Sequence, residues 1–530
     1  LALAATLLVP ALLMAQAPVP AGLLRDYHFR SIGPAAAGGL ITAVRGLERD
    51  PRFAIAAAAS GGVWKTEDMG LTWTQIFDRD GAAMGASSIG AVAIFQPNPQ
   101  ILWVGTGEAN NRNSVAWGDG IYKSSDGGRS FQNMGLRDTF QIARVVTHPS
   151  NPDVAYVAAV GNLWGYTGTR GVFKTSDGGR SWQHLTAGLP DDGKTGATDL
   201  VMDPSNPEVL YAAMYQRLRR PWRFDSGGSP PGSGGGIFKT SDGGAHWVQL
   251  TQGLPAGPTG RIGLDVYRKN PRIVMAIVEA SFGYQCTGRG AAQSPDCASL
   301  AKLGSGIYRS EDGGAHWQFL NRYNNRPFYY SQIRINPGND QIVYVLSTSF
   351  QESHDGGHTF AQQRAPFGPN YDYHAMWLDP NQPGRFYLGG DKGLWLSQDG
   401  GATMQFFDNL PIEQFYKVAT DTRDPYAVYG GLQDNGADGT MSFTRDALGI
   451  RNDAAWKMHW DDGQYVAVDP TDWRRVYSEG TEGTFRVVDP IGHSDTQRRA
   501  TPETITNFQA ATGLAPDAPG AAKAIRFNWT

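Results

Sequence analysis

The chain contains seven copies of one short pattern, Ser/Thr-x-Asp-x-Gly-x-Ser/Thr/His-Trp/Phe. The copies begin at Thr66, Ser124, Thr175, Thr240, Ser310, Ser353 and Ser397. The last copy has Met404 in place of the aromatic residue. The seven aspartates lie 58, 51, 65, 70, 43 and 44 residues apart. Repeats of about 40–50 residues are typical of propellers and solenoids, in which each unit buries its apolar surface against its neighbours.

Each repeat is predicted to form four short strands, named A to D here. In the second unit, residues 89–95 alternate in polarity, and Pro-Asn-Pro at 97–99 ends this run. Residues 101–104 form a second apolar run, and residues 120–123 precede the repeated pattern. Four short strands joined by turns make the blade of a β-propeller. We therefore predict an all-β fold, a seven-bladed β-propeller of four-stranded blades.

The repeated pattern falls at the turn between strands C and D. Its aspartate can accept hydrogen bonds from N–H groups of its own turn, and its glycines allow backbone angles that a Cβ would resist. The rival reading, catalysis or metal binding, needs one special place rather than seven equivalent ones. The predicted turn aspartates are Asp68, Asp126, Asp177, Asp242, Asp312, Asp355 and Asp399.

Two further apolar hairpins, at residues 415–429 and 465–478, follow the last copy without the pattern. We predict one closed propeller over residues 25–418 and the first blades of an incomplete second propeller over 419–530. The alternative is a single ring of nine or ten blades.

The N-terminal residues predict export. Residues 3–14 form an apolar run too short to span a bilayer, and Ala-Gln-Ala at 15–17 matches a signal-peptidase site. We predict a signal peptide over 1–17 and a secreted, periplasmic or cell-surface protein, with an uncleaved anchor as the alternative. An oxidising compartment favours a disulfide between Cys286 and Cys297, although two free thiols are the other possibility.

Charge and composition limit the partners. The net charge of −4 and the sequence pI near 6.2 do not favour nucleic-acid binding. Two cysteines without a neighbouring histidine do not make a zinc site. We therefore predict no nucleic-acid partner, no metal and no cofactor, and we leave the oligomeric state open.

The variable loops gather on one face. In a four-stranded blade, the B–C and D–A connections lie on the face opposite to the A–B and C–D turns. Insertions on one rim of a rigid scaffold are where binding function usually lies. We predict that ligand-binding residues on this face are Glu108, Asn110, Arg112, Trp117, Asp119, Trp164, Tyr215, Arg217, Trp222, His374 and Gln433. The alternative for the aromatic residues is packing of loop against loop, and the alternative for His374 is a purely structural position.

The repeats resemble those of the Asp-box (BNR-repeat) propellers, which include sialidases, sortilin-type receptors and xyloglucan hydrolases built from two seven-bladed propellers. The chain is most similar to secreted bacterial proteins described as sortilin-like or as BNR-repeat glycosyl hydrolases. The phrases that carry this resemblance lie at residues 29–34, 105–110, 117–120, 429–436 and 468–471. The resemblance implies the fold and covers nearly everything after residue 25.

One departure from the xyloglucan hydrolases concerns catalysis. Their first-blade catalytic aspartate precedes a Gly-Gly-x-Tyr/Trp phrase, but the similar stretch here, residues 59–64, has Ser60 at that place. Asp391 and Asp434 occupy comparable places in later blades, so a displaced catalytic pair is our hypothesis for an enzyme. Other carboxylates on this face have no assigned role, and no spacing selects the arginine triad of a sialidase.

These observations lead to two functional hypotheses. The first is a propeller that binds an extended polymer, peptide or glycan, on the face formed by the B–C and D–A loops. The alternative is a glycoside hydrolase with a carboxylate pair in a cleft between two propellers. Whether the chain is an enzyme stays open at this point.

Overall fold

The computed structural model describes residues 30, 32–33, 38–78, 86–112, 115–220, 223–226, 235–280, 304–362, 371–460, 462–481, 484–490, 494–499 and 515. The chain divides into two units, residues 1–31 and 32–530, and the description below concerns the second unit. The predicted signal peptide, the two cysteines and Trp222 lie outside the described residues.

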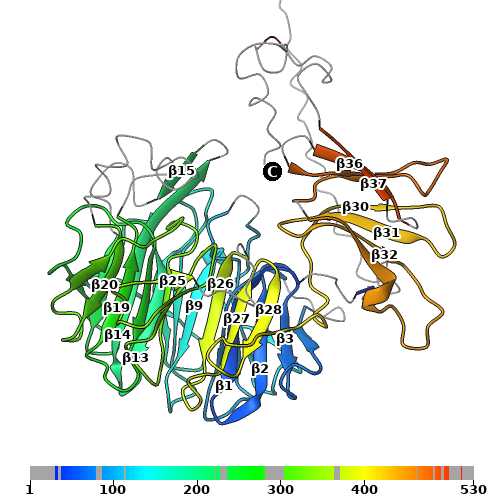
Figure 1. Ribbon diagram of the computed structural model, residues 1–530. Helices are drawn as coiled ribbons and strands as arrows, with labels where there is room; N and C mark the ends of the chain where they lie inside the picture. Colours follow the sequence, from blue (N-terminus) through cyan, green and yellow to red (C-terminus); the bar gives the residue numbers. More distant parts are fainter. Residues whose placement is uncertain are drawn as a thin grey trace, which may run out of the picture. The chain divides into compact units, whose positions relative to one another are not determined.

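The described residues form nine antiparallel sheets, each built from four strands that follow one another in the chain (Figure 1). The strands of the first three sheets are β1 (Ile41–Leu47), β2 (Asp50–Ala58), β3 (Val63–Thr66), β4 (Thr74–Phe77), β5 (Ile89–Ile94), β6 (Leu102–Thr106), β7 (Ile121–Ser124), β8 (Gln132–Asn133), β9 (Ile142–Thr147), β10 (Ala155–Ala159), β11 (Gly171–Thr175) and β12 (Gln183–Leu185). The fourth to sixth sheets contain β13 (Thr195–Asp203), β14 (Asn206–Arg220), β16 (Gly236–Thr240), β17 (Val248–Leu250), β18 (Ile262–Val266), β19 (Val274–Val278), β20 (Gly306–Ser310), β21 (Gln318–Asn321), β22 (Gln332–Ile335), β23 (Val343–Leu346), β24 (Gln351–Ser353) and β25 (Ala361–Gln362).

The remaining sheets contain β26 (Tyr373–Leu378), β27 (Phe386–Gly390), β28 (Gly393–Ser397), β29 (Gln405–Phe406), β30 (Phe415–Thr420), β31 (Ala427–Leu432), β32 (Gly436–Met441), β33 (Ala455–His459), β34 (Val466–Val468), β35 (Val476–Glu479), β36 (Thr484–Asp489) and β37 (Ser494–Arg499). The fourth sheet carries an additional short strand, β15 (Arg223–Ser226), paired with β14. Two short 3-10 helices, η2 (Arg137–Thr139) and η6 (Asn452–Ala454), complete the described elements. Among these residues, no helix has the length and apolar character needed to cross a membrane.

Burial follows the position of a strand in its sheet. The first two strands of a sheet are nearly continuous apolar runs, and every residue of β5, β6 and β27 is buried. The fourth strand is exposed, as in β17. Strands covered on both faces need apolar residues at successive positions, whereas an outer strand does not. The inner strands therefore make the cores between neighbouring sheets.

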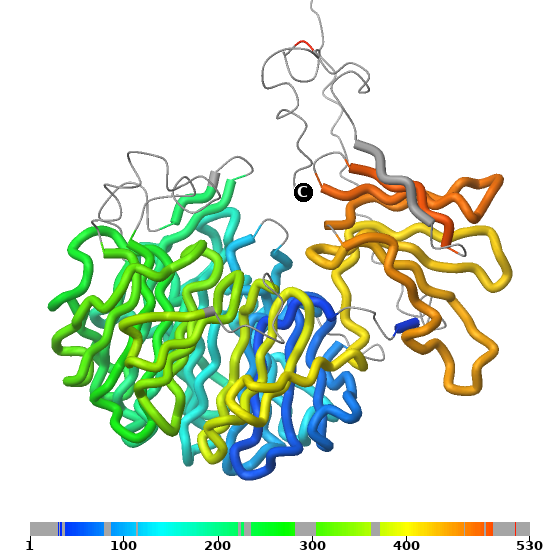
Figure 2. Tube along the Cα trace, viewed as in Figure 1, coloured from blue at the N-terminus to red at the C-terminus, as the bar shows by residue number. Residues whose placement is uncertain are grey.

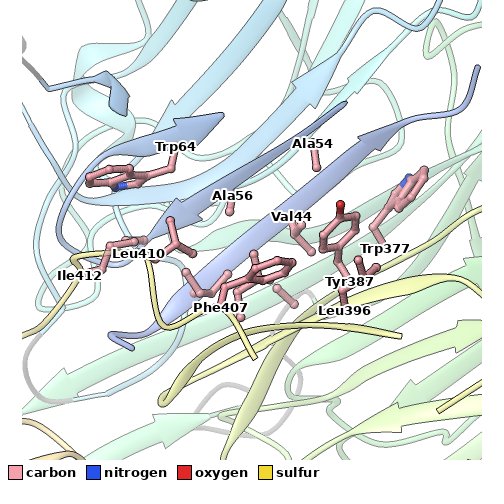
Figure 3. Packing of buried hydrophobic residues seen from close by; sticks show 14 residues of the cluster. Val44, Ala54, Ala56, Trp64, Trp377, Tyr387, Leu396, Phe407, Leu410 and Ile412 are labelled. Carbon is pink, nitrogen blue, oxygen red and sulfur yellow. The ribbon is translucent and has the colours of Figure 1, made fainter. Parts of the chain in front are cut away.

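The first and seventh sheets share a core although they lie far apart in the sequence. Val44 of β1 packs in one buried cluster with Trp377 of β26 and Tyr387 of β27 (Figure 3). A Cβ at Gly46 would lie 2.4 Å from the Trp377 ring, so β1 needs glycine at this point. The inner strands β1 and β26 are thus direct neighbours.

All seven repeated turns have a common hydrogen-bond arrangement, in which the ring of His246 or His316 replaces the second hydroxyl group in two copies. In the third copy, Thr175 Oγ1 donates to Asp177 Oδ1 at 2.9 Å, and the Ser181 N–H and Oγ donate to the two carboxylate oxygens at 3.0 and 2.6 Å. The bonds from Ser181 hold the pKa of Asp177 below its usual range. Gly179 has φ 98°, which a residue with a Cβ rarely adopts, and its N–H donates to Thr175. This is the arrangement expected of an aspartate that stabilises its own turn.

The eighth and ninth sheets, β30–β33 and β34–β37, share a smaller core that includes Tyr429 and Val476 (orange in Figure 2). Their inner strand β30 differs from β1 and β26 because two of its apolar side chains are exposed, Phe415 at 49% and Val418 at 60%. The sequence predicted two unpatterned A–B hairpins in this region, and each belongs to a complete four-stranded sheet.

Candidate functional site

Asp391 and Asp434 come together in the folded chain. Asp391 follows β27 in the turn to β28, and Asp434 follows β31 in the turn to β32. Their carboxyl groups are hydrogen-bonded to each other. Asp391 is buried, whereas Asp434 is partly exposed and has a left-handed backbone with φ 59°. The two corresponding B–C turns of different sheets thus contribute one carboxyl pair.

Backbone hydrogen bonds fix both turns. The Asp391 N–H donates to the carbonyl oxygens of Tyr371 and Asp372, each at 3.1 Å. The Asp434 N–H donates to Asp462 Oδ1 at 2.6 Å. The buried amide of Asn435 donates to the Asp391 carbonyl at 3.0 Å and so ties one turn to the other. The carboxyl pair therefore rests on a preorganised backbone.

The surroundings favour the protonated form of the pair. Burial raises the pKa of Asp391 well above its usual range, and the negative charge of Asp372 adds to this effect. Loss of solvation and the charge of Asp391 likewise raise the pKa of Asp434. The Arg112 guanidinium opposes both shifts. Two close carboxyl groups cannot both ionise cheaply, so the pair retains a proton to higher pH than a free aspartate.

His374 lies beside this pair in its neutral form. Its Nε2 is 2.8 Å from Asp391 Oδ1, but the contact lacks the alignment of a hydrogen bond. Burial lowers the pKa of His374 to about 3, so the contact is not an ion pair at neutral pH. The ring packs against Tyr329 and Tyr330, with centroids 4.7 and 5.3 Å away. His374 is therefore a packed side chain that forms one wall of the site.

A buried ion pair provides the positive charge. Arg112 binds both carboxylate oxygens of Glu108 through hydrogen bonds of 2.8–3.0 Å, and the two side chains are 7% and 1% exposed. Arg112 also donates to Gln414 Oε1 at 3.1 Å, and the Gln414 amide lies 3.5 Å from Ser60 Oγ. Ser60, the residue at the place of the missing first-blade aspartate, is thus connected to the same site through Gln414.

Aromatic side chains surround the partly exposed side of the site. The Tyr416 hydroxyl is buried and has no hydrogen-bond partner among the described residues, and burial together with Asp434 and Asp462 raises its pKa. Trp460 is 70% exposed, with the Lys457 ammonium 5.0 Å from its ring centroid. Lys457 also donates to the carbonyl of Asn435, next to Asp434. Trp460 therefore offers an exposed aromatic face close to the Asp434 turn.

The structure brings some of the predicted ligand-binding residues to this site and leaves others apart. Glu108, Arg112, His374 and Gln433 surround it or contact its neighbours, although all four are buried. Asn110 is buried and accepts a hydrogen bond from Arg261. Elsewhere on this face, Trp117 and Trp164 are 55% and 37% exposed, and Asp119 binds Tyr122 and Arg137.

The structure places Tyr215 and Arg217 in the interior, and their role in ligand binding stays a prediction. The expected loop from Tyr215 is a β-hairpin, because β14 continues to Arg220 and pairs with β15. Tyr215 and Arg217 are each 1% exposed. Arg217 donates to the backbone oxygens of Ala109 and Gly161 and to the side-chain oxygens of Asn111 and Gln141.

Several residues of the site were not predicted from the sequence. These are Tyr329, Tyr330, Asp372, Gln414 and Tyr416. Asp372 follows the same D–A junction as His374 and was open to prediction from that position. The others carry no motif, because their proximity depends on segments that lie far apart in the chain.

Comparisons with known proteins find two curated relatives of low identity. No protein-family profile matches the chain. A xyloglucanase of Paenibacillus sp is 24% identical over 322 residues, which cover 54% of this chain and 28% of that protein. A probable oligoxyloglucan-reducing end-specific xyloglucanase of Neosartorya fischeri is 24% identical over 238 residues, 42% of this chain and 25% of that protein. The matches thus span about a quarter of the length of these curated relatives.

Solved structures agree on the fold. A GH74 enzyme of Niastella koreensis superposes with a TM-score of 0.60 at 16% identity, over 89% of this chain and 68% of that one. A GH74 xyloglucanase of Xanthomonas campestris gives a TM-score of 0.54 at 14% identity, over 88% and 80% of the two chains. Together with the repeated four-stranded sheets, this likeness shows that the chain has a β-propeller fold.

Proposed function

We propose that the chain is part of a glycoside hydrolase whose catalytic pair is Asp391 and Asp434. The observation that carries this proposal is the carboxyl pair itself, formed by two corresponding turns whose surroundings raise the pKa of both carboxyl groups. Glycoside hydrolysis requires a carboxylic acid that protonates the leaving oxygen and a carboxylate that activates water or attacks the sugar. We assign the acid to Asp434, because it is the partly exposed member, and the carboxylate to Asp391.

The short distance between the two carboxyl groups implies that they separate when a sugar binds. Carboxyl groups are about 5–5.5 Å apart in retaining glycosidases and about 6.5–9.5 Å apart in inverting ones. A hydrogen-bonded pair is closer than either. Entry of a sugar between Asp391 and Asp434 therefore breaks their hydrogen bond, and the proton that they share goes to Asp434, which donates it to the glycosidic oxygen. Arg112 then stabilises the ionised Asp391.

The substrate class follows from the relatives and from the aromatic side chains. The curated relatives are named as xyloglucan-degrading enzymes, and the exposed ring of Trp460 near Asp434 suits the apolar face of a sugar. We therefore infer a β-linked polysaccharide of the xyloglucan type as the substrate. Binding of a polymer without hydrolysis, our first hypothesis from the sequence, is the second candidate. The presence of Ser60 in place of an aspartate favours it.

The experiment is hydrolysis of xyloglucan and its oligosaccharides by the full chain, followed by chromatography of the products. We expect release of oligosaccharides by the wild type and loss of at least 100-fold in rate for Asp434→Asn and Asp391→Asn. The matched control is Asp453→Asn, which removes an exposed aspartate whose partner is Arg451. Binding to xyloglucan without any product from the wild type would support the second candidate and overturn hydrolysis.

We also propose an architecture for this activity. The adjacency of β1 and β26 supports a closed seven-bladed propeller over residues 25–418, and the smaller core of β30–β37 supports a second propeller that begins after it. Secretion after removal of residues 1–17, with a disulfide between Cys286 and Cys297, stays a prediction. Mass spectrometry of the exported protein would test both.

A further inference from the structure

A second cavity lies on the face opposite to the carboxyl pair. It has a volume of about 490 Å³ and lies between inner strands of the first seven sheets, where strands A and B are joined. Its rim includes Glu48, Pro97 and Pro204, which belong to or adjoin A–B turns. Asp391 and Asp434 follow strand B, and the A–B and B–C connections of a blade lie at opposite ends of its strands. The cavity is therefore separate from the proposed catalytic site.

Charged side chains on inner strands line this cavity. They are Arg45 of β1, Arg144 of β9, Asp199 and Asp203 of β13, Asp265 of β18 and Arg334 of β22. Arg144 and Asp199 form an ion pair with Nε 2.6 Å from Oδ1. The inner strands thus contribute three guanidinium groups and three carboxyl groups, and Arg144 and Asp199 neutralise each other.

Arg45 and Arg334 make only hydrogen bonds to neutral acceptors among the described residues. Arg45 Nη1 donates to the carbonyl of Val44 at 2.9 Å. Arg334 donates to the carbonyl of Ile333 at 2.6 Å and to Gln332 Oε1 at 3.3 Å. Burial and the neighbouring guanidinium groups lower the pKa of Arg45 to about 9, and the same causes lower the pKa of Arg334. An anion between them would relieve this repulsion.

The two aspartates already have structural partners. Asp199 Oδ2 accepts from the Leu264 N–H at 3.0 Å, and Asp265 Oδ2 accepts from the Ile335 N–H at 2.7 Å. Each carboxylate thereby joins its own sheet to the next one. Burial raises the pKa of Asp265 to about 6, so this carboxylate is still mostly ionised at neutral pH. The charged groups that line the cavity therefore balance, and the feature that favours an anion is the pair of arginines, Arg45 and Arg334, whose hydrogen bonds go to neutral acceptors.

We propose that this cavity binds the oxyanion group of a small molecule, a phosphate or a carboxylate, between Arg45 and Arg334. Guanidinium groups suit both oxyanions because they present several N–H donors in a fixed plane. Met376 and Trp377 line the same cavity and provide an apolar wall for the rest of the molecule. A volume of this size suits a small ligand. At the rim, Arg268 binds both carboxylate oxygens of Glu48 at 2.8 Å, and this pair joins the fifth sheet to the first across the entrance.

Calorimetric titration of the full chain with sodium phosphate and, separately, with sodium succinate tests this proposal. Sodium chloride at equal ionic strength is the baseline, and thermal unfolding is followed in parallel. We expect saturable binding of at least one probe with a matching rise in the unfolding temperature. Arg45→Gln and Arg334→Gln should each weaken this binding at least tenfold. The control Arg52→Gln changes an exposed arginine paired with Asp50 and should leave it unchanged.

The outcomes are distinguishable. Binding of phosphate alone assigns a phosphate site, and binding of succinate alone assigns a carboxylate site. Heats equal to those of sodium chloride, or equal affinity in Arg45→Gln and the wild type, would overturn the proposal. Arg45→Gln decides the result if Arg334→Gln does not fold, because the hydrogen bond that Arg45 donates to Val44 stays within its own strand. Asp434→Asn should bind the probe normally, which separates this site from the proposed hydrolase.

Discussion

Removal of Arg112 tests the buried charge balance of the site. In the Arg112→Met variant, Glu108 remains 1% exposed and keeps only the long 3.4 Å bond from the Asn110 amide. An uncompensated buried charge costs about 3–5 kcal/mol. Glu108→Leu should cost a similar amount, because Arg112 would then keep only Gln414 as a hydrogen-bond partner among the described residues. The double variant removes both charges, and we expect it to lose less than about 2 kcal/mol.

Urea-induced unfolding, followed by tryptophan fluorescence, measures these differences when the m-values agree. The double-mutant cycle should show a coupling of at least about 2 kcal/mol between Glu108 and Arg112. The control Arg451→Met removes an exposed ion pair with Asp453 and should change the midpoint little. A loss below about 1 kcal/mol for Arg112→Met, or a double variant as unstable as the sum of both single variants, would refute the reasoning.

Three further predictions follow from the site and the turns. Hydrolysis should fall as pH rises, because Asp434 then loses its proton. Arg112→Met should shift this limb of the pH–rate profile to higher pH, because Arg112 lowers the pKa of both aspartates. An unchanged limb would exclude the aspartate pair as the source of the pH dependence. A carboxyl group whose pKa is higher in the folded than in the unfolded state destabilises the fold at pH values above its unfolded pKa of about 3.9. Asp391→Asn should therefore raise the thermal unfolding midpoint at pH 7 but not at pH 3. A lower midpoint at pH 7 would contradict this. Asp355→Ala removes the hydrogen bonds that Thr359 and Ser353 donate to Asp355, and it should destabilise the fold by about 1 kcal/mol. The thermal unfolding midpoint should fall, and the rate of hydrolysis should stay unchanged.

The fold was predictable because its information is local. A turn aspartate, its glycines and the flanking hydroxyl group satisfy one another within eight residues, and the same solution recurs seven times. The apolar runs before each turn then give four strands, as seen in β5–β8. The β14–β15 hairpin was missed because Arg217 and its neighbours have the polar composition of a loop. Their burial depends on distant acceptors such as Gln141 and Gly161.

The candidate site was only partly predictable, because much of it depends on contacts between segments that lie far apart in the chain. Corresponding positions after strand B singled out Asp391 and Asp434, since equivalent turns of a propeller share a face. Their hydrogen bond, and the wall formed by Tyr329 and His374, require segments more than 40 residues apart to meet. A single sequence does not encode such distances in any local pattern.

The sequence by itself determined the strand pattern, the repeated turns and the face on which function was sought, because these depend on short-range hydrogen bonding and on apolar periodicity. The tertiary structure decided which charges are buried and paired, because burial sets solvation and therefore the pKa. It raised the pKa of both Asp391 and Asp434 and lowered the pKa of His374. It also placed Arg45 and Arg334 in one cavity, where packing of distant inner strands leaves each of them with hydrogen bonds to neutral acceptors among the described residues.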